Sequence, residues 1–421
     1  QAKDPTYFVR RPLPVAKSTA VTASLSVNRV ADADGWISVG PSASLGCSDV
    51  LRFDHARRTY AIYRTDDKRL YATDGICTHG ATHLADGLVS GELIECPKHN
   101  GRFDITNGSP KRAPACVALR TYAVRELAGT IQLNVSRMGG AALPPTHRFR
   151  VVSATSVATF IRELVLEPEP GTALPPYRPG EYFQFDIPAY PAFALSTLEV
   201  APPFDALWRT QGVGELRAEN PAPCRRNYSL ASNPATDPYL RFNVRLALPP
   251  RGSGGLAGSG SAWVFRLRPG DSVSAIGPFG DFHIRPGTDE MIYLGGGAGM
   301  APLRSHLSHL LETHRSTRRI SFWYGARSRQ ELFYDRYFSD LAAQHPNFTF
   351  HPALSEPLPG DSWNGATGFI HAVLLRDYLA THANPTAIDY YLCGPPPMIE
   401  AATAMLLGLG VDRQRIAFDV F

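Results

Sequence analysis

Short runs of apolar residues, separated by turn-forming residues, fill the chain up to about residue 286. Between residues 31 and 137, four runs have the length and composition of strands: Trp36–Val39, Tyr60–Arg64, Leu93–Glu95 and Ile131–Val135. Five more follow between residues 147 and 286: Phe149–Val152, Ile161–Leu166, Tyr182–Ile187, Leu240–Leu246 and Ser272–Ile276. The stretch Pro188–Cys224 is long and irregular, and we interpret it as an insertion. The pattern predicts two successive β domains.

The pattern changes near Met291, where apolar runs begin to alternate with stretches of helical periodicity. The strand-like runs are Met291–Leu294, Ile320–Tyr324, Phe348–Pro352 and Tyr390–Cys393. The helix-like stretches are Ala301–Thr313, Glu331–Gln344, Phe369–His382 and Pro397–Leu409. This alternation predicts βαβ units around a parallel sheet.

We therefore expect a multi-domain protein, as its 421 residues also suggest. The expected parts are an N-terminal arm (1–30), an all-β domain (31–137), a linker (138–146), a second β domain (147–286) and an α/β domain (287–421). The linker joins a Gly-Gly pair to a Pro-Pro pair and has no periodicity of its own.

Composition excludes several classes of function. Lys and Arg outnumber Asp and Glu by only 42 to 38, which argues against nucleic acid or an anionic membrane as the main partner. No run approaches the roughly 18 apolar residues of a membrane span. Six cysteines are too few for a disulfide scaffold, so we expect a reduced, cytoplasmic setting. The chain begins with Gln1, and whether an upstream segment was removed is left open.

Two short motifs pair one cysteine with one histidine each. Cys77 and His79 form C-x-H, and Cys96 and His99 form C-x-x-H. Two thiolates on one iron and two imidazoles on the other is the ligation of a Rieske [2Fe–2S] centre. A Cys2His2 zinc site is the alternative, but zinc fingers pair Cys with Cys and His with His.

These motifs, in GICTHGATHLADG and IECPKHNGRFDI with a later Pro114, resemble the Rieske ferredoxins and the Rieske domains of aromatic-ring dioxygenase systems. The resemblance covers most of residues 31–137 and implies a compact β domain with the cluster at its tip. The extra loop cysteines of high-potential Rieske proteins are missing, so we expect a midpoint potential of about −150 mV. We expect His83 at the surface or behind the ligands, and Cys47 and Cys116 as buried small hydrophobes.

A second set of motifs points to a flavin. Arg226, Tyr228 and Ser229 form R-x-Y-S, and Gly258-Ser259-Gly260-Ser261 leads into a helix-like run. Pro-Gly-Asp at 269–271 and Gly-Pro-Phe-Gly at 277–280 follow. In this order the motifs resemble the flavin domain of the ferredoxin–NADP reductase superfamily, an antiparallel β-barrel.

The resemblance implies a role for each residue. Tyr228 would stack on the isoalloxazine and Ser229 would lie near its N5. Arg226 would bind the pyrophosphate, with the backbone amides of Gly258, Gly260 and Ser261 as a second phosphate site, which favours FAD over FMN. Arg245, on the following strand, is a further candidate for flavin contact.

A glycine-rich turn follows the first strand of the α/β domain. The sequence GGGAGMAP carries Gly297, Gly299 and Pro302 in a G-x-G-x-x-P pattern, a cradle for a dinucleotide pyrophosphate. The same superfamily implies that Cys393, in YLCGPPPM, orients the nicotinamide and that a C-terminal aromatic, here Phe421, covers the flavin.

Residues 147–421 look closest to the reductase module of the F subunit of sodium-translocating NADH:quinone reductase, through GPFGDF, GGGAGMAPLRSH, SFWYGARSRQELFY and GFIHAVL. That likeness favours NADH, although Arg327 and Arg329 are candidates for binding the 2′-phosphate of NADPH. The plant-type ferredoxin spacing C-x4-C-x2-C and the membrane helix of those subunits are missing.

We expect an NADH-dependent reductase that passes electrons from NADH through FAD and the Rieske cluster to a partner oxygenase, either a Rieske non-haem iron enzyme or a diiron monooxygenase. A subunit of a respiratory NADH:quinone oxidoreductase is the first alternative. A carrier or regulatory module with a vestigial nicotinamide site is the second.

Overall fold

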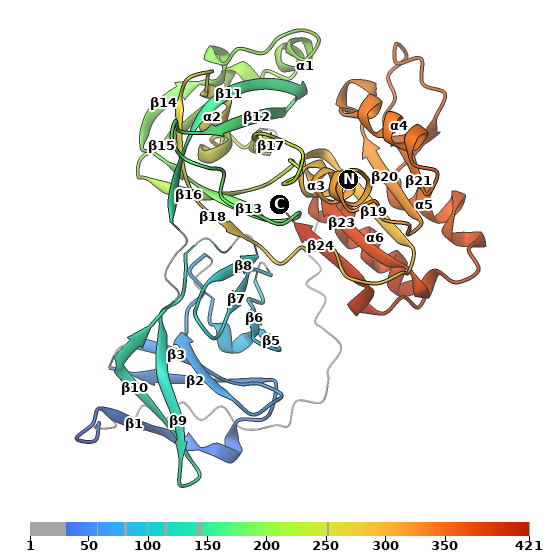
Figure 1. Ribbon diagram of the computed structural model, residues 1–421. Coiled ribbons are helices and arrows are strands. Elements are labelled where there is room, and N and C mark those ends of the chain that lie inside the picture. Colours follow the sequence, from blue (N-terminus) through green and yellow to red (C-terminus); the bar gives the residue numbers. More distant parts are fainter. Residues whose placement is uncertain are drawn as a thin grey trace, which may run out of the picture.

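The computed structural model describes residues 31–56, 58–79, 82–98, 100–112, 115, 117–140, 145–250 and 252–420. The expected N-terminal arm, His99, Cys116 and Phe421 lie outside these residues. The described chain forms a small β domain, a curled β sheet and an α/β domain (Figure 1). The first domain lies below the other two in this view, and its β5–β8 end faces them.

The first domain contains two antiparallel sheets. One has the order β1-β10-β9-β4-β3-β2 and the other β5-β6-β7-β8. Alternate residues of β3 divide between two cores, because successive side chains of a strand point to opposite faces. Tyr60 and Ile62 pack in one core, and Ala61 and Tyr63 pack in the other with Cys77 and Cys96. The strands are β1 (Trp36–Pro41), β2 (Asp49–His55), β3 (Arg58–Arg64), β4 (Leu70–Asp74), β5 (Leu88–Ser90), β6 (Leu93–Glu95), β7 (Arg102–Asp104), β8 (Pro110–Arg112), β9 (Thr121–Leu127) and β10 (Thr130–Gly139).

The second domain is an antiparallel sheet in the order β16-β13-β18-β11-β12-β17. An isolated bridge between Leu230 and Phe242 joins the two ends of this order, so the sheet curls into a barrel. Its interior is apolar and aromatic, with Phe149, Phe183 and Phe242 buried. The strands are β11 (Thr146–Ala158), β12 (Ile161–Pro168), β13 (Tyr182–Ile187), β16 (Cys224–Ser229), β17 (Leu240–Arg245) and β18 (Ser272–Phe279), with helix α2 at Ser259–Arg266.

The stretch 188–224, expected to be irregular, contains regular structure. Strands β14 (Tyr190–Ala194) and β15 (Arg217–Asn220) pair as a ribbon, and helix α1 spans Asp205–Thr210. Trp208 of α1 is buried against Phe265 of α2 and donates a hydrogen bond to the Thr159 carbonyl. The segment is therefore an insertion with its own small core.

The third domain is a parallel sheet in the order β22-β21-β20-β19-β23-β24. Both faces are covered: Met291 and Tyr293 of β19 pack on the side of α3 and α4, whereas Ile292 and Leu294 pack on the side of α5 and α6. The strands are β19 (Met291–Gly296), β20 (Ile320–Ala326), β21 (Phe348–Leu354), β22 (Ala366–Thr367), β23 (Asp389–Gly394) and β24 (Ile416–Val420). The helices are α3 (Met300–Ser308), α4 (Asp335–Gln344), α5 (Ile370–Asp377) and α6 (Pro396–Gly408).

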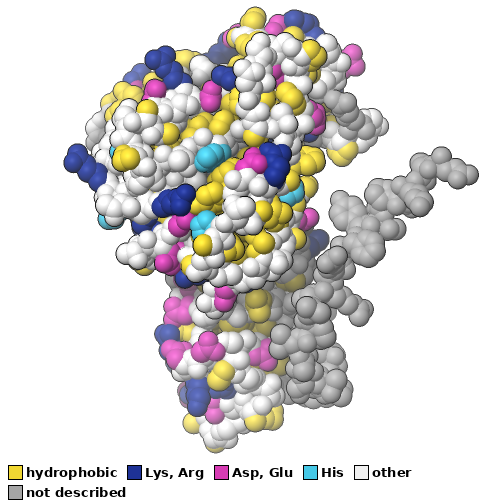
Figure 2. All heavy atoms as spheres, turned by 90° about the vertical axis from the view of Figure 1, so that its right-hand side faces the viewer, with side chains coloured by type: hydrophobic (Ala, Val, Ile, Leu, Met, Phe, Trp, Pro, Cys, Tyr) yellow, Lys and Arg dark blue, Asp and Glu magenta, His cyan; other side chains and the backbone are white. Residues whose placement is uncertain are grey.

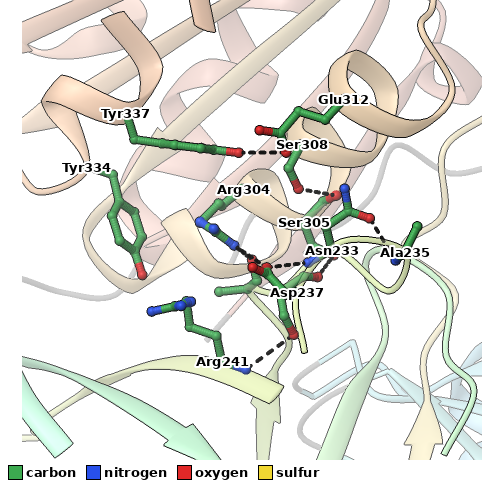
Figure 3. Close-up of polar contacts among 12 residues, drawn as sticks. Asn233, Ala235, Asp237, Arg241, Arg304, Ser305, Ser308, Glu312, Tyr334 and Tyr337 are labelled. Atoms are coloured by element: carbon green, nitrogen blue, oxygen red, sulfur yellow. Dashed lines mark hydrogen bonds and ion pairs between the residues drawn. The ribbon is translucent and has the colours of Figure 1, made fainter. Parts of the chain in front are cut away.

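A buried polar network joins the barrel to the α/β domain (Figure 3). Arg304 of α3 forms an ion pair with Asp237 at 3.0 Å and lies over the rings of Tyr334 and Tyr337. Ser305 donates to the Ser232 carbonyl at 2.7 Å. These contacts set the position of α3, and with it the glycine-rich turn, relative to the barrel.

The face of the α/β domain seen in Figure 2 carries hydrophobic side chains interspersed with charges of both signs. Among the described residues, no helix has both the length and the apolar character that crossing a bilayer requires.

Candidate functional site

Two loops at the end of the first domain carry the metal-ligand candidates. The Cys96 loop is the turn between β6 and β7, closed by the Cys96 amide on the Gly101 carbonyl at 2.8 Å. The Asn100 amide donates to the Cys96 carbonyl at 3.0 Å, with Asn100 in the left-handed region (φ 57°). The Cys77 loop is closed by the Cys77 amide on the Thr82 carbonyl at 2.8 Å.

The two cysteines share one environment. Cys77 and Cys96 are both buried, are both free thiols, and belong to one hydrophobic cluster. His79 is exposed at the tip of its loop. Buried thiols in tight loops beside an exposed imidazole suit a cluster held by sulfur on its inner side and nitrogen on its outer side. Among the described residues, which do not include His99, no three His, Cys, Asp or Glu side chains are grouped as metal ligands.

His83 is buried, which agrees with the expected position behind the ligands and not with the alternative at the surface. Its Nε2 lies 2.7 Å from Thr59 Oγ1, and its Nδ1 accepts a bond from the Ala85 amide at 2.9 Å. Burial and the charge of Arg52 lower the pKa of His83. With both ring nitrogens occupied, His83 supports the loop and does not ligate a metal. The expectation that Cys47 is buried was wrong, because its side chain is exposed.

Strand β16 carries the flavin candidates, and the start of α2 lies against it. A Cβ atom added to Gly260 would lie 2.5 Å from Arg226 Cγ and 2.9 Å from Tyr228 Oη, so a larger residue here would displace these side chains. Ser261 Oγ accepts from the Ala247 amide at 3.0 Å and donates to the Gly258 carbonyl at 3.1 Å. Arg226, Tyr228 and the first turn of α2 are therefore in contact.

Ser229, at the end of β16, meets the last strand of the parallel sheet. Its Oγ donates to Asp419 Oδ2 at 3.4 Å, and both residues are buried. Asp419 of β24 is paired in register with Cys393 of β23. The sequence analysis did not identify Asp419, although it lies two residues before Phe421, the aromatic residue expected to cover the flavin. A lone acidic residue in an apolar strand end was the available signal.

Cys393 is completely buried. Burial raises the pKa of its thiol well above the ordinary value, and the Asp419 carboxylate raises it further. Gly299 packs on its backbone: an added Cβ there would lie 2.1 Å from the Cys393 carbonyl oxygen. A neutral, fixed thiol is suited to packing against a ligand ring rather than to nucleophilic attack.

The glycine-rich turn opens onto two adjoining cavities between the barrel and the α/β domain, of about 1260 and 700 Å³. Gly297 has φ +57°, and its carbonyl accepts a hydrogen bond from Tyr324 at 3.0 Å. Gly299 lines the larger cavity, and Pro302 is the third residue of α3 and is buried. The size, the glycines and the helix start fit a dinucleotide.

Two arginines from different domains line both cavities. Arg245 of the barrel and Arg327 after β20 face the same space. Desolvation, together with the charge of Arg327, lowers the pKa of Arg245. This unfavourable pair of cations is the arrangement that an anionic ligand relieves. Arg329 is instead paired with Asp335 at 2.9 Å and lies over the Trp363 ring.

Glu356, after β21, also lines both cavities, and its amide donates to the Arg327 carbonyl at 2.7 Å. Sequence reasoning missed this residue. The signal was an acidic side chain two residues after β21, at the carboxyl ends of the parallel strands, where ligands of open α/β sheets bind.

Models of two known protein families match separate parts of the chain. A Rieske [2Fe-2S] domain model matches residues 35–123, and an oxidoreductase NAD-binding domain model matches residues 293–404. Among solved structures, the Amycolatopsis cytochrome P450 reductase GcoB is 25% identical with a TM-score of 0.50, covering 69% of this chain and 76% of that one.

Curated relatives are the F subunits of Na⁺-translocating NADH-quinone reductases. The protein of Pseudomonas paraeruginosa is 43% identical over 271 residues, 64% of this chain and 66% of that relative. The protein of Methylococcus capsulatus is 43% identical over 273 residues, 64% of this chain and 67% of the relative. The chain thus spans about two thirds of the length of these relatives. By these matches and its fold, the chain belongs to the FAD- and NAD-binding ferredoxin reductase-like family and carries a Rieske [2Fe–2S] domain ahead of that module.

Proposed function

We propose that the protein is an NADH-dependent reductase that passes electrons from NADH through FAD and the Rieske cluster to a partner oxygenase. The observation that carries the proposal is the position of β16. At its C-terminal end, Ser229 meets Asp419 beside Cys393. Two residues earlier, Asn227 donates to the Ala115 carbonyl of the Rieske domain at 3.3 Å. One strand therefore contacts both the nicotinamide side and the cluster side.

The residues that would hold NADH lie around the two cavities. The amides after Gly297 and the start of α3 would receive the pyrophosphate, with Arg245 and Arg327 balancing its charge. Glu356 would accept a hydrogen bond from a ribose hydroxyl and repel a 2′-phosphate, which favours NADH over NADPH. Cys393 would hold the nicotinamide ring by packing.

The residues that would hold FAD lie on β16 and α2. Tyr228 offers a ring face, Arg226 a fork of donors for phosphate, and the first turn of α2 backbone amides. Bound FAD would accept the two electrons of a hydride from NADH and release them singly, the conversion a one-electron cluster needs. Phe421, proposed to cover the flavin, lies outside the described residues.

Cys77, His79, Cys96 and His99 would hold the [2Fe–2S] cluster, with the exposed His79 on the side open to an electron acceptor. All five cysteines that the structure describes are free thiols, which supports our placement of the protein in a reducing, cytoplasmic compartment.

Anaerobic mixing with NADH tests the electron path. Purified protein loaded with FAD and iron should bleach the flavin and then reduce the cluster, seen by absorbance and by paramagnetic resonance. A midpoint potential near −150 mV is expected, because each loop has one cysteine and not the second cysteine of high-potential Rieske proteins. Zinc in place of iron, or a cluster that NADH leaves oxidised, would contradict the proposal.

The identity of the acceptor needs a separate experiment. The likeness to a cytochrome P450 reductase supports an oxygenase, and NADH consumption should couple to hydroxylation only when that oxygenase is added. The stronger likeness to the F subunits supports a second candidate, a subunit of an NADH:quinone oxidoreductase. That candidate predicts rapid turnover with a soluble quinone that depends on the cluster.

A further inference from the structure

The Rieske domain contacts the barrel and the α/β domain through a compact charged surface. None of the residues of this surface was assigned to a cofactor above. Arg102 of β7 pairs with Asp281, just after β18, with Nη1 3.2 Å from Oδ2. Arg112 of β8 approaches the same carboxylate, with Nε 3.9 Å from Oδ1. Both arginines also pair with Glu95 of their own domain, at 2.7 and 3.6 Å. One acidic residue of the barrel therefore binds two cations of the Rieske domain.

An aromatic ring strengthens this contact from the α/β domain. The guanidinium of Arg112 lies 4.7 Å from the ring centre of Phe418, and that of Arg413 lies 4.8 Å from it. The Arg112 side chain is only 8% exposed, and burial lowers its pKa. Burying a guanidinium costs free energy unless charged or aromatic partners compensate for the lost water. The partners of Arg112 in two other domains therefore indicate that the Rieske domain has a defined docked position.

The surface lies at the cluster end of the Rieske domain. Arg102 follows the Cys96 loop by a few residues, and the Cys77 loop is tied through Thr78 Oγ1 to the Val117 carbonyl at 2.7 Å. Two residues before Val117, the Ala115 carbonyl accepts from Asn227, the neighbour of Tyr228. The charged contact and the flavin strand thus meet the same end of the domain.

We propose that Asp281, Arg102, Arg112 and Phe418 form an intramolecular docking surface that holds the Rieske domain where it receives electrons from FAD. The inference rests on the proposed function. The step it serves moves one electron: reduced FAD is oxidised by one equivalent, the cluster is reduced by one, and no atom crosses between domains. The four side chains are positioning residues, because they set how the Rieske domain lies against the barrel and the α/β domain.

Asp281→Lys is the decisive variant, since it places a third cation against Arg102 and Arg112. The matched control is Glu199→Lys, which makes the same charge change on the barrel at a side chain that is 83% exposed. After anaerobic mixing with NADH, flavin bleaching should keep its wild-type rate in both variants. Cluster reduction should slow at least about tenfold in Asp281→Lys alone. Asp281→Asn, a milder change, should slow it less.

Small-angle scattering of the oxidised protein gives a readout that does not depend on turnover. Asp281→Lys should increase the radius of gyration, and Glu199→Lys should not. In the wild type at saturating NADH, added salt should slow cluster reduction more than flavin bleaching. A wild-type rate and radius in Asp281→Lys would overturn the inference. If NADH fails to reduce the wild-type cluster, the proposed function fails, whereas scattering still decides whether Asp281 docks the domain.

Discussion

At the scale of single residues, two cysteines differ enough to be told apart chemically. Cys393 is fully buried and its pKa is raised by burial and by Asp419, whereas Cys47 is exposed. Alkylation requires an accessible thiolate. Iodoacetamide at pH 8 should therefore modify Cys47 and leave Cys393 untouched in the folded protein, as peptide mass spectrometry can measure. Equal modification of both would show that the Cys393 site opens readily.

Glu356 offers a test of donor selectivity. Glu356 and Arg327 both line the two cavities, and the Glu356 carboxylate would face an added 2′-phosphate there. Replacing it by glutamine removes a like-charge repulsion. The ratio of kcat/KM for NADPH to that for NADH should rise by about tenfold in Glu356→Gln. The exposed Glu400→Gln on α6 is the control and should leave the ratio unchanged; an unchanged ratio in Glu356→Gln would contradict the assigned position of the ribose.

At the scale of elements, α3 is fixed to the barrel side by a histidine that stays neutral. His306 bonds the Phe282 carbonyl at 2.8 Å, and burial lowers its pKa to about 3. The unfolded chain binds a proton at this residue below pH 6.5 and the folded chain does not, so stability falls as pH decreases from 6.5. The loss should approach ~1.4 kcal/mol per pH unit. In His306→Gln, urea unfolding should show a shallower decrease between pH 6.5 and 4.5; an unchanged slope would contradict it.

Elements with strong local patterns were predictable from the sequence. Strand β13 has the predicted bounds Tyr182–Ile187, and α3 begins one residue before the predicted Ala301. Both could be predicted because the spacing of apolar residues within each segment indicates its type. Strand β24 was missed, since Ile416–Val420 is short and its identity depends on pairing with β23. Segment 188–224 was missed for a similar reason: β14 and β15 lie far apart in sequence and form a ribbon only with each other.

At the scale of the whole molecule, the decisive contacts join residues that are far apart in sequence. Ser229 meets Asp419 across 190 positions, and Arg102 meets Asp281 across 179. No periodicity or motif encodes such pairs, because each side chain alone is a common surface type. The motifs therefore indicated which cofactors the chain would bind. The relative positions of the domains could be read only from the three-dimensional structure.

The Arg304–Asp237 pair is the strongest test of how the barrel and the α/β domain are coupled. Its side chains are 10% and 18% exposed, and Arg304 also donates to the Ala231 carbonyl. Asp237→Asn would leave a buried cation short of its counter-charge, so the free energy of the first urea unfolding transition should fall by about 2–4 kcal/mol. The control Asp340→Asn breaks an exposed pair with Arg336 and should cost less than about 0.5 kcal/mol. Equal losses in the two variants would show that Arg304 does not couple the domains.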